Sequence, residues 1–126
     1  MVKMLRKVDK HSGIPAYIQI GNMIKAEIIL GNLPQGAQLP PVRDLQYIFD
    51  VNINTVLKAL DKLKNEGFIE AEQGVGYFVK KDISVEEEII KTVKDCIQKI
   101  KALGIDFYTI MLIFEEVWKN ESSPDA

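Results

Sequence analysis

The sequence predicts a mainly α-helical fold with one small β-hairpin. Two helical segments joined by a short turn, residues 42–49 and 53–66, are followed at residues 68–79 by two short apolar runs around a glycine-rich tip. This order, helix, turn, helix and hairpin, is that of a winged helix-turn-helix, in which the hairpin forms the wing. Two further helical segments come later in the chain. We therefore expect a winged helix-turn-helix domain at residues 1–82 and a helical tail at residues 83–126.

The first 13 residues are basic and have little apolar periodicity. Such a segment can contact DNA phosphates as a basic arm, or it can remain a solvated terminus. Because no regular apolar stripe fixes it to a core, we favour the solvated terminus. Its basic side chains are Lys3, Arg6, Lys7 and Lys10.

Residues 15–30 predict a supporting helix. Ile20, Ile24 and Ile28 recur every fourth residue and therefore share one helix face, and Gly31 can end the helix in a left-handed conformation. The next residues are rich in Asn, Pro and Gly, which is typical of a turn. After this turn, residues 37–39 are expected to add a short strand to the hairpin.

The central helix is predicted at residues 53–66. Asn52 can cap its start by accepting a hydrogen bond from the backbone N–H three residues later, and Gly67 can end it. In the preceding turn, Asp50 tolerates the left-handed conformation better than most residues other than glycine. The apolar stripe of the central helix, expected to be buried, consists of Val56, Ala59, Leu60 and Leu63.

The tail predicts two helices. Ser84 and Glu87 form a capping box for the first, which should end at Gly104, and Asp106 can cap the second, which should run to about Asn120. The second helix is apolar around most of its circumference, more than two helices can cover, so we expect a homodimer. The alternative is a monomer whose tail folds back on the winged domain. The expected interface anchors are Phe107, Ile110, Phe114 and Trp118.

Four segments of the chain carry a family resemblance: PAYIQI at 15–20, ILGNLPQGAQLPPVRDL at 29–45, VNINTVLKAL at 51–60 and NEGFIEAEQGVGYFV at 65–79. They resemble the DNA-binding domain of the GntR family of bacterial transcription regulators, and the short helical tail is similar to the YtrA-type subfamily. The resemblance implies a sequence-specific transcription regulator that binds double-stranded DNA as a homodimer on an inverted-repeat operator. Whether it acts as a repressor or an activator stays open.

The resemblance also implies which residues contact DNA. An arginine can donate two hydrogen bonds to phosphate or guanine, an asparagine can pair with adenine, and hydroxyl and ammonium groups suit phosphates. Some of these residues also have structural interpretations, such as capping for the asparagine before the central helix. The implied DNA-binding residues are Arg43, Asn52, Ile53, Asn54, Thr55, Leu57, Lys58, Gln73, Gly74 and Gly76.

The chain departs from the family pattern by losing charge. Ile53, Leu57 and Val75 stand where relatives often carry basic residues, and Pro41 replaces a frequent serine. The first two can contact thymine methyl groups, or they can merely broaden the buried stripe. The loss of charge also leaves a second function class open, a winged-helix protein–protein interaction module with weak or lost DNA binding.

Composition excludes several other classes. The net charge is −2 overall, with +2 on residues 1–82 and −4 on residues 83–126, so the predicted DNA-binding half is the basic one. Without a membrane-length apolar run or a signal sequence, we expect a cytoplasmic protein with no membrane contact. His11 and Cys96 are the only His and Cys, and they assemble neither an enzyme site nor a metal site. We expect no cofactor, and a small-molecule effector stays possible but unidentified.

Overall fold

The computed structural model describes residues 4–81 and 86–121, and the mainly helical fold with a two-stranded hairpin is confirmed. The chain divides into two compact units, Met1–Glu87 and Glu88–Ala126. The predicted domain boundary at residue 82 and the capping residue Ser84 lie outside the described residues. The elements are α1 (Ala16–Ile29), α2 (Val42–Phe49), α3 (Ile53–Asn65), β1 (Ile69–Glu72), β2 (Gly76–Val79), α4 (Glu86–Ala102) and α5 (Phe107–Asn120).

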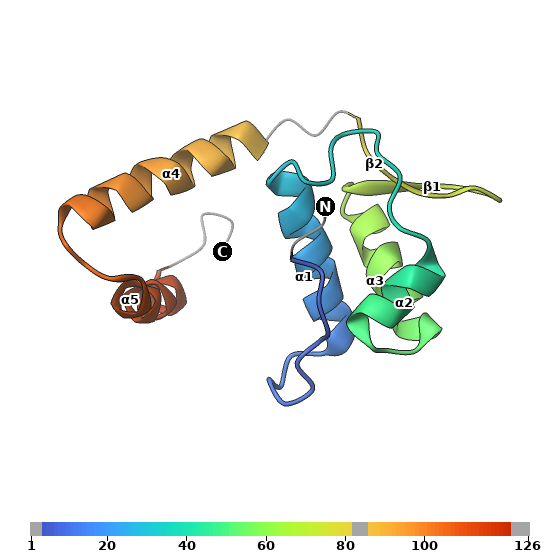
Figure 1. Cartoon of the computed structure of the whole chain (residues 1–126), viewed down its shortest axis with the longest axis horizontal. Coiled ribbons are helices and arrows are strands. Elements are labelled where there is room, and N and C mark those ends of the chain that lie inside the picture. The colour runs from blue at the N-terminus through green and yellow to red at the C-terminus, as the bar shows by residue number, and fades with distance from the viewer. Residues whose placement is uncertain (1–3, 82–85, 122–126) are drawn as a thin grey trace. The chain divides into compact units, whose positions relative to one another are not determined.

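The first unit has its core where α1 and α2 pack against α3 (Figure 1). The predicted stripes are buried: Ile20, Ile24 and Ile28 on α1 are at most 2% exposed, and all four stripe residues of α3 are fully buried. Leu45 and Phe49 of α2 are also fully buried. The three helices thus form one apolar core, and the opposite face of each central helix remains at the surface.

The ends of the central helices follow the sequence prediction. The Asn52 side chain accepts a hydrogen bond of 3.1 Å from the Thr55 backbone N–H and caps α3. Gly67 follows α3 with φ +84°, and the next backbone N–H donates to the Leu63 carbonyl, which completes a Schellman motif. Asp50 takes φ +55° in the turn between α2 and α3. Asn52 and Asp50 fix where α3 begins relative to α2, and Gly67 fixes where α3 ends.

The wing is a twisted antiparallel hairpin that packs against the end of α3. In its register Ile69 lies opposite Val79, and both side chains are buried. The segment before α2 runs beside β2, because the Leu39 N–H donates to the Tyr77 carbonyl and the Val79 N–H donates to the Ala37 carbonyl, each at 2.8 Å. The predicted short strand at residues 37–39 is therefore present as a bridge to β2.

The N-terminal arm, described from residue 4, is not a solvated terminus, so that expectation is wrong. Val8 is only 8% exposed and its N–H donates to the Phe49 carbonyl at 3.2 Å, while Leu5 packs against the core. The Asp9 N–H donates to Gln19 Oε1, and Gln19 Nε2 donates back to the Asp9 carbonyl, both at 2.9 Å. The two apolar residues fix the arm although they are too few to form a detectable stripe.

Glu27 is an unexpected buried carboxylate on α1. Its side chain is fully buried, and Oε1 accepts hydrogen bonds from the Met4 N–H at 3.3 Å and from Asn32 Nδ2 at 3.1 Å. A buried polar group requires such partners. Glu27 therefore joins the arm, α1 and the turn after α1. Its position beside Ile28 on the buried face of the helix did not allow this role to be predicted from the sequence.

The second unit consists of α4 and α5, which do not pack against each other along their lengths. Asp106 caps α5 as predicted, accepting a hydrogen bond of 2.8 Å from the Thr109 N–H, which lowers the pKa of the Asp106 carboxyl. No residue of α5 is buried: Trp118 is 83% exposed, Phe107 65% and Phe114 42%. Within the described residues, no helix is long and apolar enough to cross a membrane.

Candidate nucleic-acid interface

The N-terminal half of α3 presents a mixed polar and apolar surface. Asn54 is exposed, and the aliphatic side chains of Ile53 and Leu57 are 46% and 37% exposed. Both aliphatic residues therefore lie outside the fully buried stripe. The first two turns of α3 offer an amide and two apolar groups to any partner that approaches this end of the helix.

Asn52 and Asn54 differ in what they can still bind. Asn52 Oδ1 accepts hydrogen bonds from both the backbone N–H and the hydroxyl of Thr55, at 3.1 and 3.3 Å. A bidentate contact to adenine needs the amide oxygen as well as the amide nitrogen. Because the cap occupies the oxygen of Asn52, the exposed Asn54 is the better candidate for reading adenine, and the Thr55 hydroxyl is already engaged in the cap.

Lys58 is held at the surface by α1. Its Nζ lies 4.0 Å from the centroid of the Tyr17 ring, within the range of a cation–π contact. The pair joins residues 41 positions apart, so the spacing within α3 could not predict it. Tyr17 restricts the ammonium group to one side of α3.

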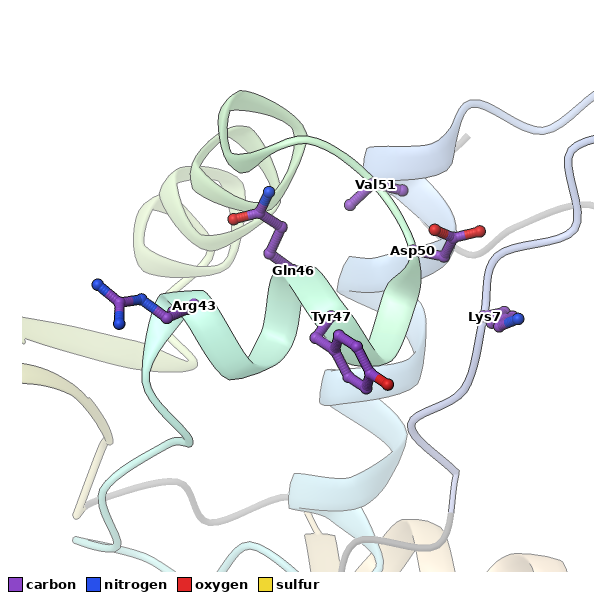
Figure 2. A pocket seen from close by; sticks show the side chains of 6 residues that line it. All are labelled: Lys7, Arg43, Gln46, Tyr47, Asp50 and Val51. Carbon is purple, nitrogen blue, oxygen red and sulfur yellow. The ribbon is translucent and has the colours of Figure 1, made fainter.

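Arg43 lies at the surface of α2 and borders an open pocket of about 490 Å³. Figure 2 shows Arg43 at one end of the pocket and Lys7 of the arm at the other, with Gln46 and Tyr47 between them. Val51, one residue before the cap of α3, also lines it. The pocket is thus continuous with the start of α3. Sequence reasoning identified Arg43 but did not connect it with the arm.

The tip of the wing has the conformation that its glycines allow. Gly74 has φ +78° at the third position of a turn closed by the hydrogen bond from the Val75 N–H to the Glu72 carbonyl, and Gly76 has φ +144°. Gln73 and Val75 are exposed. Gln38 Nε2 donates to the Val75 carbonyl at 3.1 Å and thereby braces the tip from outside the hairpin, a contact that sequence reasoning missed.

The far end of α3 carries an ion-pair cluster. Lys62 Nζ lies 2.9 Å from one Glu66 oxygen, and Lys25 Nζ of α1 lies 3.4 Å from the other. The hydrogen bond from Lys62 is the largest cause that lowers the pKa of Glu66, and the charges of Lys25 and Lys62 add to it against the opposing effect of desolvation. The cluster fastens α3 to α1. Across residues 4–81 and 86–121, no group of three His, Cys, Asp or Glu side chains gathers as a metal site.

Comparison with known proteins matches the sequence that forms this surface to one family. Residues 16–79 match the family described as "Bacterial regulatory proteins, gntR family". The chain is 32% identical over 124 residues to the HTH-type transcriptional repressor YtrA of Bacillus subtilis, a match that covers 95% of this chain and 93% of that protein. Two other curated regulators match over 56% and 57% of this chain. The matched segments cover 31% and 15%, respectively, of the lengths of those two proteins.

Solved structures agree with this assignment. YtrA from Sulfolobus acidocaldarius, a GntR-family transcription factor, shares 32% identity and a TM-score of 0.58 over 75% of this chain and 98% of that one. AraR(DBD) in complex with operator ORX1 shares 26% identity and a TM-score of 0.57 over 60% of this chain and 95% of that one. The chain belongs to the GntR family of bacterial regulatory proteins.

Proposed function

We propose that this chain is a sequence-specific transcription regulator that binds double-stranded DNA as a homodimer on an inverted-repeat operator. The observation that carries the proposal is the exposed, capped N-terminal half of α3 beside Arg43 of α2. A helix end of this kind fits the major groove, where its first residues meet the base edges. The full-length similarity to a named transcriptional repressor supports the same function.

The proposed contacts follow from the chemistry of each exposed group. Asn54 reads adenine, and Ile53 and Leu57 contact thymine methyl groups. Arg43 contacts phosphate or guanine, and Lys58 supplies a charge to the backbone. Gln73, Gly74 and Gly76 of the wing contact the neighbouring groove, while Asn52 and Thr55 act mainly by shaping the start of α3.

We also propose that a second copy of the chain covers α5. Phe107, Phe114 and Trp118 follow one another at spacings of seven and four residues and therefore lie on one stripe, with Ile110 beside it. A continuous apolar stripe on an exposed helix is the kind of surface that a two-fold dimer buries against itself. Two copies of α3 would then be presented to the two halves of an inverted repeat.

The dimer proposal is tested by sedimentation of the full chain and of two variants. Trp118→Ala should shift the protein toward monomer, since loss of an aromatic anchor costs on the order of 2–4 kcal/mol. Glu116→Ala is the matched control, because Glu116 lies on the polar side of the same helix. A chain ending at residue 82 should be monomeric, and a dimer formed by that shortened chain would place the interface elsewhere.

A second candidate function is a winged-helix protein–protein interaction module. The observation in its favour is that Ile53, Leu57 and Val75 expose aliphatic surface at positions proposed to contact DNA. Titration of the full chain with duplex DNA at several salt concentrations separates the two functions. For a DNA-binding protein the logarithm of the affinity falls linearly with the logarithm of the salt concentration, and Arg43→Ala should reduce the slope by about one if Arg43 contacts a phosphate. Absence of binding at low salt would favour the interaction module.

The assignments of biochemical role, location and effector are less specific than those of the DNA contacts. We infer a regulatory rather than a catalytic role, because the similar curated proteins are named as transcriptional regulators. A cytoplasmic location follows from that role. A small-molecule effector is compatible with the proposal, and no pocket is assigned to one.

A further inference from the structure

The pocket beside α2 offers a run of hydrogen-bond donors. Arg43, Tyr47 and Lys7 are exposed, and Gln46 is partly exposed between them (Figure 2). Guanidinium, ammonium, hydroxyl and amide groups can all donate hydrogen bonds to an acceptor that carries no proton of its own. Asp50 is the one carboxylate in the lining, and Lys10 lies 3.5 Å from it, so the excess charge of the pocket is positive.

The arm holds the backbone of Lys7 in place. Leu5 packs against the core on one side of Lys7, and on the other side Val8 is buried and bonded to the Phe49 carbonyl. A backbone that is already fixed lowers the entropic cost of ordering the residue when a ligand binds. Lys7 therefore stands beside α2 as part of a formed surface, whereas a lysine on a free terminus would have to be ordered by its ligand.

The shape of the pocket favours an extended anion. Arg43 and Lys7 stand at opposite ends, and α2 rises about 10 Å between Arg43 and Asp50 at the usual 1.5 Å per residue. One phosphate group cannot contact both ends, whereas a nucleic-acid strand carries phosphates at about 3.4 Å intervals along the helix axis. The open mouth also leaves a small ligand largely in solvent, unlike the enclosed sites that small ligands occupy.

We propose that Lys7 and Tyr47 extend the DNA interface by binding the phosphate backbone that flanks the bases read by α3. This inference rests on the proposed function and adds a positioning contact to it. Because phosphate contacts carry no sequence information, the pocket should set the orientation of α3 in the groove and increase affinity for every sequence alike.

The test compares Lys7→Ala and Tyr47→Phe with Arg6→Ala in the full chain, on selected operator DNA and on an unrelated duplex. Arg6 is the matched control, because it is exposed on the same arm and lies outside the pocket lining. Lys7→Ala should weaken both complexes about three- to tenfold and reduce the salt slope by about one. Tyr47→Phe should weaken both about twofold, and Arg6→Ala should have a smaller effect than Lys7→Ala.

Two results would overturn the inference while the proposed function stands. In the first, wild type binds DNA tightly and Lys7→Ala and Arg6→Ala weaken binding equally. The arm would then contribute only general electrostatic attraction. The second is binding of inorganic phosphate by wild type but not by Lys7→Ala, together with unchanged DNA affinity in Lys7→Ala, which would assign the pocket to a free anion. Failure of wild type to bind any duplex would instead refute the proposed function itself.

Discussion

The wing depends on a glycine whose replacement has a calculable cost. Gly76 has φ +144°, and a Cβ added there would lie 2.9 Å from Gln38 Nε2. The backbone strain amounts to about 1–3 kcal/mol. The Gln38 side chain can swing away, but it then loses its hydrogen bond to the Val75 carbonyl, about 0.5 kcal/mol at an exposed site. Gly76→Ala should therefore destabilise the first unit by about 2 kcal/mol.

Chemical and thermal unfolding of three variants, Gly76→Ala, Gln38→Ala and the double variant, separates the two contributions. In a unit of this size 1 kcal/mol shifts Tm by about 4–8 °C, so Gly76→Ala should lower Tm by roughly 10 °C. Gln38→Ala alone should cost about 0.5 kcal/mol, and the double variant should cost no more than Gly76→Ala, since the same hydrogen bond is lost only once. Additive costs would show that the contact between the two residues is wrongly described.

Gly21→Ala is the matched control with the opposite sign. Gly21 lies inside α1 and nothing lies within 4 Å of an added Cβ, so alanine should stabilise the helix by about 0.5–1 kcal/mol. Unchanged stability of Gly76→Ala together with stabilisation by Gly21→Ala would refute the reasoning about the wing. Destabilisation by both would contradict the open space described around Gly21.

Three further predictions concern α3. The hydrogen bond from Lys62 lowers the pKa of Glu66 below its ordinary 4.5. Because solvent screens this pair, Glu66→Gln should lower the free energy of unfolding by at most about 0.5 kcal/mol at pH 7. This difference from wild type should disappear as pH falls through the lowered pKa, and urea unfolding at a series of pH values measures the difference. Asn52→Ser keeps a capping oxygen for the Thr55 N–H and removes the amide, so thermal stability should stay within about 0.5 kcal/mol; a several-fold loss of operator affinity in titration would then identify Asn52 as a base contact as well as a cap. Ile53→Arg should shift selected DNA sites toward guanine at one symmetric pair of positions, and an unchanged site preference in a folded variant would exclude Ile53 from the groove.

Much of the fold was predictable because it is recorded in local patterns. The isoleucines of α1 and the stripe of α3 follow helical spacing, and Gly31 and Gly67 stand at the left-handed positions where helices end. Asp50 was predicted to tolerate its unusual φ, and Asp106 to cap α5. Each of these features depends on residues within about one helical turn of one another.

The features that escaped prediction are contacts between distant parts of the chain. The arm reaches Phe49 from Val8, Gln38 reaches the wing tip 37 residues later, and Lys58 meets Tyr17. No local pattern specifies such pairs, because they arise only when the helices pack. Their common consequence is to hold the exposed groups of the candidate interface in place.

We propose that the exposed start of α3 reads DNA as one half of a symmetric pair. Selection of bound fragments from genomic and random duplex DNA by the full-length chain tests it most directly. The selection should enrich an inverted repeat whose half-site centres lie about 10–10.5 bp apart, or a multiple of that, with half-sites rich in A·T. Enrichment of a single asymmetric motif would contradict the proposed dimer, and absence of any enriched sequence would contradict sequence-specific recognition by α3.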